Sequence, residues 1–358
     1  MISLLIKPVS NKCNLKCTYC FYNDVASKRS VQNLNTMSHK TLETLVANAI
    51  NQAKSQASFA FQGGEPTLAG LDFFKQVIFT QRKYNKKKLK IYNSIQTNGI
   101  LIDNEWAEFF KENNFLVGIS LDGYKEVHEL NRGSSFNKVM KAITLLNKFN
   151  VAYNILSVVT STSAKHIGKI YSFFKKNNFN YLQFIPCLDK LSQDRGTEKY
   201  SLSPTQYELF LIALFDVWYE DFMNDKYISI RTFDNYVNIL MGKAPESCDM
   251  NGSCSCSFVV EANGNVYPCD FYSIDEFKIG TIRNNFKEMQ NSNISKQFID
   301  RSTIIPSKCL ECNYSSLCRN GCYRYRDENL NYYCTSYSNF FNYALPKMKI
   351  IIEEKICK

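Results

Sequence analysis

Lys12-Cys13-Asn14-Leu15-Lys16-Cys17-Thr18-Tyr19-Cys20 is the stretch that decides the fold of this 358-residue chain. Its cysteines follow the spacing C-x3-C-x2-C, and the next cysteine in the sequence is Cys187. An ordinary electron-transfer [4Fe-4S] cluster is held by four thiolates. Three thiolates leave one iron open, and an open metal position indicates chemistry at the metal.

Zinc binding and disulfide formation are the other uses to weigh for these cysteines. A zinc site normally takes four nearby ligands, and none of the three histidines, His39, His128 and His166, is close in sequence to the triplet. Disulfide frameworks are typical of small secreted chains. The apolar opening, Met1 to Lys7, is too short for a signal peptide and reaches a charged residue too early. No run in the sequence approaches the ~20 apolar residues of a membrane span. We expect a cytoplasmic monomer with reduced thiols and no membrane contact.

The composition is that of a globular protein, with 45% hydrophobic residues. The formal net charge of +10 would suit nucleic acid, but the basic residues are scattered. The densest run, Lys86-Lys87-Lys88, falls between an expected helix and an expected strand, where a solvated face is the simpler explanation. We therefore expect no nucleic-acid partner.

Strand-like and helix-like runs alternate through the first half of the chain, which predicts a parallel α/β sheet. The expected strands are 2–6, 59–61, 89–95, 116–121, 153–159 and 181–185, and the expected helices are 40–53, 71–82, 105–113, 136–149 and 165–176. Six units are too few to close an eight-stranded barrel. We predict a partial (β/α)6 barrel over 1–225, a cysteine-rich domain over 226–335 and a carboxyl-terminal helix over 336–358, with its aromatic residues Phe340, Phe341 and Tyr343 packed in the core.

The polar motifs follow the strands, at the carboxyl-terminal edge where parallel sheets hold their sites. Gly63-Gly64-Glu65-Pro66 comes after the second strand, and two glycines let a backbone approach a ligand closely. Ser120 ends the fourth strand and can meet a ribose hydroxyl or a carboxylate. Arg132, in the loop beyond, can pair bidentately with a carboxylate. Taken alone, each of these is equally well a turn or a solvated loop residue.

Together, C-x3-C-x2-C with an aromatic residue before the third cysteine and Gly63-Gly64-Glu65-Pro66 after the second strand resemble the signature of radical S-adenosylmethionine (SAM) enzymes. The resemblance implies that Cys13, Cys17 and Cys20 bind a [4Fe-4S] cluster whose open iron chelates SAM. It also implies that the double-glycine motif meets the amino group of SAM, and that Arg132 meets its carboxylate.

A second cysteine set resembles the SPASM extension of these enzymes, with its pattern C-x(9 to 15)-G-x4-C, C-x2-C-x5-C-x3-C and a final cysteine. Nine residues separate Cys254 from Gly264, within the pattern, whereas only seven separate Cys256 from it. The resemblance implies two further [4Fe-4S] clusters, the first held by Cys248, Cys254, Cys269 and Cys322 and the second by Cys309, Cys312, Cys318 and Cys334. A zinc module is the alternative. Cys187, Cys256 and Cys357 remain without a role.

The match extends to one SPASM subgroup, the anaerobic sulfatase-maturating enzymes, which it resembles in Phe61–Leu68, Ser94–Gly99, Asn131-Arg132, Leu182–Ile185 and Val266–Tyr272. These enzymes oxidise a cysteine or serine of a sulfatase to formylglycine. The resemblance implies a substrate with a Cys/Ser-x-Pro-x-Arg motif and a flavodoxin- or ferredoxin-like electron donor. One departure is the loop Gly133-Ser134-Ser135-Phe136, which is shorter than we expect for clostridial members.

The resemblance also implies individual roles. SAM cleavage would give a radical that removes hydrogen from the substrate Cβ, Asp270 would accept a proton, and the first auxiliary cluster would take the second electron. Tyr19 and Leu188 would flank the adenine, and Tyr22 and Gln62 would face the substrate peptide. Packing of the cysteine loop explains Tyr19 equally well, and a core position explains Leu188.

Two other functions stay open at this stage. One is a SPASM maturase that crosslinks a ribosomal peptide; many of these carry an added amino-terminal domain, for which a first strand at Ile2 leaves no room. The other is a zinc or iron–sulfur scaffold without catalysis, which the three-cysteine loop with its double-glycine motif disfavours.

Overall fold

The computed structural model describes residues 1–32 and 34–356 and divides into two compact units. The first unit comprises Met1–Ser120, Arg132–Tyr153 and Ser255–Phe298, and the second comprises Leu121–Asn131, Asn154–Cys254 and Ile299–Lys358. The units are interleaved along the chain. We placed domain boundaries at 225 and 335 so that the expected auxiliary-cluster ligands fall in one domain. That division stays a prediction.

The sheet of the first unit is mainly parallel. Its strands run in the order β10-β9-β8-β1-β2-β3-β4. The pairs β1·β2, β2·β3, β3·β4 and β1·β8 are parallel, while β8·β9 and β9·β10 are antiparallel. The bounds are β1 (Ile2–Ile6), β2 (Gln56–Phe61), β3 (Lys90–Thr97), β4 (Phe115–Ser120), β8 (Val259–Val260), β9 (Asn265–Tyr267) and β10 (Gly280–Thr281).

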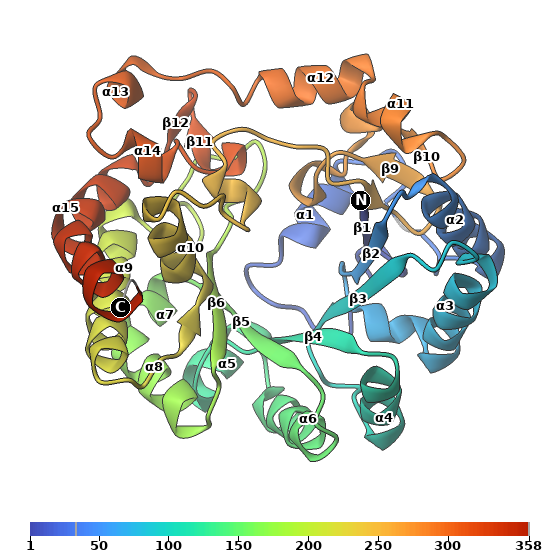
Figure 1. The fold of residues 1–358 in the computed structure, drawn as a ribbon, viewed down its shortest axis with the longest axis horizontal. Coiled ribbons are helices and arrows are strands. Elements are labelled where there is room, and N and C mark those ends of the chain that lie inside the picture. Colours follow the sequence, from blue (N-terminus) through green and yellow to red (C-terminus); the bar gives the residue numbers. More distant parts are fainter. Residues whose placement is uncertain (33, 357–358) are drawn as a thin grey trace. The chain divides into compact units, whose positions relative to one another are not determined.

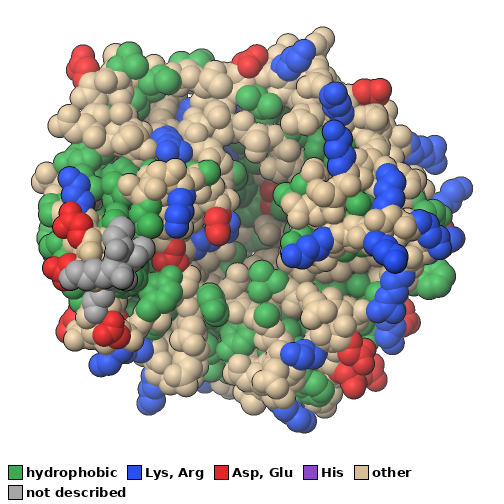
Figure 2. Space-filling view, in the orientation of Figure 1, with side chains coloured by type: hydrophobic (Ala, Val, Ile, Leu, Met, Phe, Trp, Pro, Cys, Tyr) green, Lys and Arg blue, Asp and Glu red, His purple; other side chains and the backbone are tan. Residues whose placement is uncertain are grey.

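The larger helices of this unit cover the outer side of β1–β4 (Figure 1). In Figure 1, α2, α3, α4 and α6 lie on the outer side of these strands and α1 lies on the opposite side. Ser38 and Asp103 cap α2 and α4 through their side-chain oxygens. Lys and Arg side chains gather over α2 and α3 (Figure 2). The bounds are α1 (Phe21–Ser27), α2 (His39–Gln52), α3 (Leu71–Tyr84), α4 (Asn104–Glu112), α6 (Phe136–Lys148), α11 (Phe286–Gln290) and α12 (Asn293–Asp300), with short turns η1 (Pro66–Ala69), η3 (Asp270–Tyr272) and η4 (Asp275–Phe277).

The register of the parallel strands brings the motifs to one edge. Ile6 pairs with Phe61, Phe61 with Ile95, and Thr97 with Ile119. The cysteine loop and the double-glycine turn therefore follow neighbouring strand ends, as predicted, and Asn98 follows the end of β3 beside them. The lysine run at 86–88 lies at the opposite edge, in the turn between α3 and β3.

The second unit combines three parallel strands with helices. In Figure 1, α15 lies alongside α9, and the two helices pack together. The bounds are β5 (Tyr153–Val159), β6 (Tyr181–Pro186), β7 (Ser229–Ile230), α5 (Lys125–Arg132), α7 (Ser161–Lys165), α8 (Ile167–Lys176), α9 (Pro204–Met223), α10 (Arg231–Leu240), α13 (Ser307–Leu310), α14 (Ser315–Cys318) and α15 (Cys334–Ile351). The hairpin β11 (Arg326–Asp327) and β12 (Leu330–Asn331) and the turns η2 (Cys248–Met250), η5 (Tyr323–Tyr325) and η6 (Ile352–Ile356) complete it.

The expected carboxyl-terminal helix begins earlier than predicted, at Cys334. Phe340 and Phe341 are fully buried, as expected, whereas Tyr343 is partly exposed and donates to Asp216 at 2.7 Å. No helix in the described part of the chain is both long and apolar enough to cross a membrane.

Two expectations about local structure were wrong. The helix expected over 165–176 begins two residues late, as α8, because the chain leaves helical geometry at His166; the short helix α7 before it was not expected. Arg132 ends α5 and is buried, although we expected a loop.

Candidate active site

The cysteine loop, residues 12–20, lies against the double-glycine turn. The amide of Glu65 donates to the carbonyl of Lys12 at 2.9 Å. Gly64 has a φ of +54°, and a Cβ there would lie 2.2 Å from the Lys12 carbonyl oxygen. Only glycine allows this approach of two backbones, so the turn fixes the position of the loop.

Glu65 joins the ends of β2 and β3. Its Oε1 accepts from the Thr67 hydroxyl at 2.6 Å and the Thr97 hydroxyl at 2.7 Å, and its Oε2 accepts from the Asn98 amide at 2.7 Å. Burial raises the pKa of this carboxyl, although the hydrogen bonds partly offset the effect. Its predicted contact with the SAM amino group stays a prediction.

The surroundings of Cys13 disfavour ionisation of its thiol when no metal is bound, although the sulfur accepts two hydrogen bonds. It accepts from the Leu15 amide at 3.3 Å and from Asn98 Nδ2 at 3.8 Å. Burial raises the pKa of this thiol, and the nearby Glu65 and Cys20 raise it further, against the lowering effect of the hydrogen bonds. Thiols gathered beside a carboxylate suit an iron–sulfur cluster, which supplies the positive charge that thiolates need.

Arg132 and Tyr19 lie together beside the cysteine loop. The Arg132 guanidinium carbon lies 5.3 Å from the centre of the Tyr19 ring, and its Nη1 donates to Cys17 Sγ at 3.8 Å. Ser120, at the end of β4, accepts from Gln96 Nε2 at 3.0 Å. Tyr19 thus packs the loop. The contacts of these residues with SAM stay predictions, as does that of Leu188, which is buried in the second unit.

Asp270 meets both residues that we expected to face the peptide. Its Oδ2 accepts from the Tyr22 hydroxyl at 2.8 Å and from Gln62 Nε2 at 3.3 Å. Its Oδ1 lies 2.7 Å from Lys7 Nζ. Burial and the Asp270 charge raise the pKa of Tyr22 well above its ordinary value, so Tyr22 stays protonated and donates.

Sequence reasoning missed a buried charge cluster behind Asp270. Lys7 Nζ also lies 3.2 Å from Glu261 Oε1, and Arg29 Nη2 lies 2.5 Å from the same oxygen. Burial alone would raise the pKa of Glu261, but the charges of Lys7 and Arg29 outweigh it and hold the pKa below its ordinary value. Lys7 gave one signal in the sequence, a charge at the end of an apolar strand. Arg29 and Glu261 gave none.

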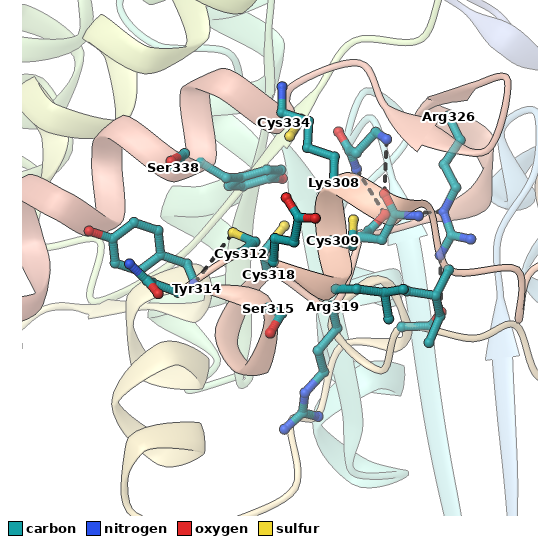
Figure 3. A pocket seen from close by; sticks show the side chains of 18 of the residues that line it. Lys308, Cys309, Cys312, Tyr314, Ser315, Cys318, Arg319, Arg326, Cys334 and Ser338 are labelled. Carbon is teal, nitrogen blue, oxygen red and sulfur yellow. Dashed lines mark hydrogen bonds between the residues drawn. The ribbon is translucent and has the colours of Figure 1, made fainter.

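Four of the carboxyl-terminal cysteines line one cavity of about 830 Å³ in the second unit. Figure 3 shows Cys309, Cys312, Cys318 and Cys334 with their side chains directed toward a shared space. Burial raises the pKa of Cys318 to about 12, and the other three thiols contribute to that rise. These are the ligands predicted for the second auxiliary cluster.

Three ligands predicted for the first auxiliary cluster are also neighbours. Burial raises the pKa of Cys322 to about 12, and Cys248 and Cys254 contribute to that rise. The amide of Cys254 donates to Ser302 at 2.7 Å. Cys256 and Cys269 belong to the first unit. The electrostatic effect of Cys254 on Cys322 favours Cys254 over Cys256, and the ligand set stays a prediction.

Cys187 and Cys357 are cysteines to which the sequence pattern gave no role. Cys187 is buried and donates to the Tyr200 carbonyl at 3.3 Å, while Cys357 lies outside the described residues. Across the described residues, no three His, Cys, Asp or Glu side chains are grouped tightly enough for a single metal ion. The assignment of cysteines to clusters therefore rests on their pattern in the sequence and stays a prediction.

Two family models match the chain. The radical SAM superfamily matches residues 8–174, and an iron–sulfur cluster-binding domain, SPASM, matches residues 248–313. A cysteine-type anaerobic sulfatase-maturating enzyme of Clostridium novyi is 49% identical over 98% of this chain and 97% of its own length. The chain belongs to the anaerobic sulfatase-maturating enzymes. A serine-type member from Bacteroides thetaiotaomicron is 34% identical over 98% of this chain and 91% of its own length.

A solved structure of another member confirms the fold of this sulfatase-maturating enzyme. The structure described as native anSMEcpe with bound AdoMet (that is, SAM) is 50% identical and has a TM-score of 0.96, covering 99% of this chain and 100% of its own. The same protein has also been solved with AdoMet and a peptide named Cp18Cys. The expected α/β radical SAM fold, SPASM region and carboxyl-terminal helix are thus confirmed, with SAM and iron–sulfur clusters as the cofactors of the family.

Proposed function

We propose that this sulfatase-maturating enzyme oxidises a cysteine in a Cys-x-Pro-x-Arg motif of a sulfatase to formylglycine. The observation that carries the proposal is the level of identity, 49% to a cysteine-type relative against 34% to a serine-type one, each over nearly the whole chain. The sequence alone left the choice between cysteine and serine open.

The chemistry divides between the cofactors and the chain. When bound, the Cys13, Cys17 and Cys20 cluster and SAM supply the radical that removes a hydrogen atom from the substrate Cβ. Asp270 accepts the proton of the substrate thiol through its carboxylate. One further electron leaves the substrate, and hydrolysis of the resulting thioaldehyde gives the aldehyde.

The surroundings of Asp270 suit a base. Lys7 pairs with Oδ1, so the carboxylate is fixed while Oδ2 faces Tyr22 and Gln62. Because Gln62 Nε2 also donates to the Tyr22 hydroxyl at 2.9 Å, the two side chains hold each other. A carboxylate that is already fixed needs less reorganisation free energy when the proton moves.

We also propose three [4Fe-4S] clusters, with the first auxiliary cluster as acceptor of the second electron. Eleven cysteines would serve as ligands: three in the amino-terminal loop and eight in the carboxyl-terminal set. Iron analysis of anaerobically purified enzyme then gives about twelve irons per chain. Tightly bound zinc would contradict this assignment.

Anaerobic incubation with SAM, dithionite and matched Cys-x-Pro-x-Arg and Ser-x-Pro-x-Arg peptides tests the function by mass spectrometry. We expect formylglycine from the cysteine peptide, at a higher rate than from the serine peptide. SAM cleavage that leaves both peptides unoxidised would instead indicate a crosslinking maturase.

A further inference from the structure

A basic cavity of about 480 Å³ lies beside the cysteine loop in the first unit. Asn14, Leu15 and Lys16 line one side of it, and these three residues lie between the cluster ligands Cys13 and Cys17 in the sequence. Residues that follow β3 and the start of α6 line the rest. The cavity is thus lined by part of the loop that carries the proposed cluster ligands.

The charge of this cavity has a single sign. Its lining includes Lys16, Arg132 and Lys138 but no Asp or Glu. Lys16 and Lys138 are exposed, and neither forms an ion pair within residues 1–32 and 34–356. A surface of one charge sign attracts partners of the opposite charge and speeds their association.

Apolar groups accompany the cations. Leu15, Ile100 and Leu101 share the lining, and Leu101 is 39% exposed. Apolar contacts framed by charges are typical of protein docking sites, whose rims are polar. The combination suits a protein partner better than a small anion, which needs no apolar contact.

The reaction requires such a partner. A cluster that cleaves SAM must first be reduced, and in the oxidised enzyme this first electron comes from outside the chain. The cysteine loop reaches the surface at Lys16. We propose that this cavity, with Lys16 and Lys138 at its rim, is the docking face for an acidic, low-potential one-electron carrier of the flavodoxin class. The carrier is oxidised by one electron and the cluster is reduced by one. This inference rests on the proposed function.

The test is the double charge reversal Lys16→Glu/Lys138→Glu in the reconstituted enzyme. Flavodoxin hydroquinone or dithionite drives the reaction, and titration measures flavodoxin binding. We expect a loss of about tenfold or more in flavodoxin affinity and flavodoxin-driven cluster reduction, strongest at low salt. The dithionite-driven rate of Lys138→Glu alone, which lies on α6 outside the cysteine loop, should stay unchanged, because a small reductant needs no docking face.

The control is Lys86→Glu/Lys88→Glu, in the turn at the opposite edge of the sheet, which should change neither rate. If Lys16→Glu impairs cluster loading, Lys138→Glu alone, on α6, decides the outcome. Flavodoxin affinity and cluster reduction equal to those of the wild type in these variants would overturn the proposal. Because binding and cluster reduction are measured without peptide, this outcome is distinct from a failure to form formylglycine.

Discussion

Asp270 depends on charges that are themselves buried. Lys7 is 1% exposed and Glu261 is fully buried, and Arg29 completes a group of two cations and two carboxylates. A buried charge without its partner is costly. We therefore infer that the same buried charges orient Asp270 and stabilise this part of the enzyme.

Glu261→Gln tests this at the residue scale. The change leaves Lys7 and Arg29 with one negative charge fewer, and we expect it to lower the free energy of unfolding by about 3 kcal/mol at neutral pH. Because the folded-state pKa of Glu261 lies below the ordinary 4.5, its contribution is present above pH 4.5 and is lost as the pH falls below that value. Unfolding curves of both proteins, compared at each pH, should therefore converge in acid.

Glu43→Gln is the matched control. Glu43 also has a lowered pKa, because it accepts hydrogen bonds from Lys83 and Tyr84, but this ion pair is exposed. We expect little change in unfolding. Equal effects of the two substitutions would contradict the role assigned to burial.

Residue roles were predictable only where the sequence carries a motif. Asp270, Tyr22 and Gln62 were predicted from the family resemblance, and the structure places them within hydrogen-bonding distance of one another. The pair of Arg29 with Glu261 spans 232 positions in the sequence. A single sequence gives no sign of such a distant pairing.

At the element scale, the turn after β2 holds the cysteine loop in place. Gly64→Ala would add a Cβ at 2.2 Å from the Lys12 carbonyl oxygen, so the loop must shift. We expect weaker SAM binding and a lower iron content. Iron analysis and SAM titration of the reconstituted variant measure both.

Gly70→Ala separates this clash from backbone strain. Gly70 has a φ of +84°, yet a Cβ there meets nothing within 4 Å. Its ψ of 155° places it in a region that is essentially restricted to glycine, so this variant should cost about 1–3 kcal/mol of stability and keep its iron and SAM binding. Loss of SAM binding in both variants to the same extent would mean that strain, rather than the contact with Lys12, is responsible.

Elements were predictable where their pattern was clear. The expected strands 2–6 and 153–159 match β1 and β5 residue for residue, because alternating or continuous apolar runs define strands well. The prediction missed α9, although Ser203 and Gln206 form a capping box at its start. Its apolar residues surround the helix, so no amphipathic stripe marks it.

At the scale of the whole molecule, the groups that we propose for hydrogen removal and proton transfer belong to one unit. The cysteine loop, the double-glycine turn and Asp270 lie in the first unit, whereas seven of the eight proposed auxiliary ligands lie in the second. The sequence could not predict this interleaving, because the first unit is built from three separate segments of the chain.

The proton-accepting role of Asp270 is the central claim, and the yields of 5′-deoxyadenosine and formylglycine test it most directly. The wild type should form one 5′-deoxyadenosine for each formylglycine. Asp270→Asn should still cleave SAM but form formylglycine about a hundredfold more slowly or worse, since an amide cannot take the proton. Formylglycine formation by Asp270→Asn at the wild-type rate would contradict the account.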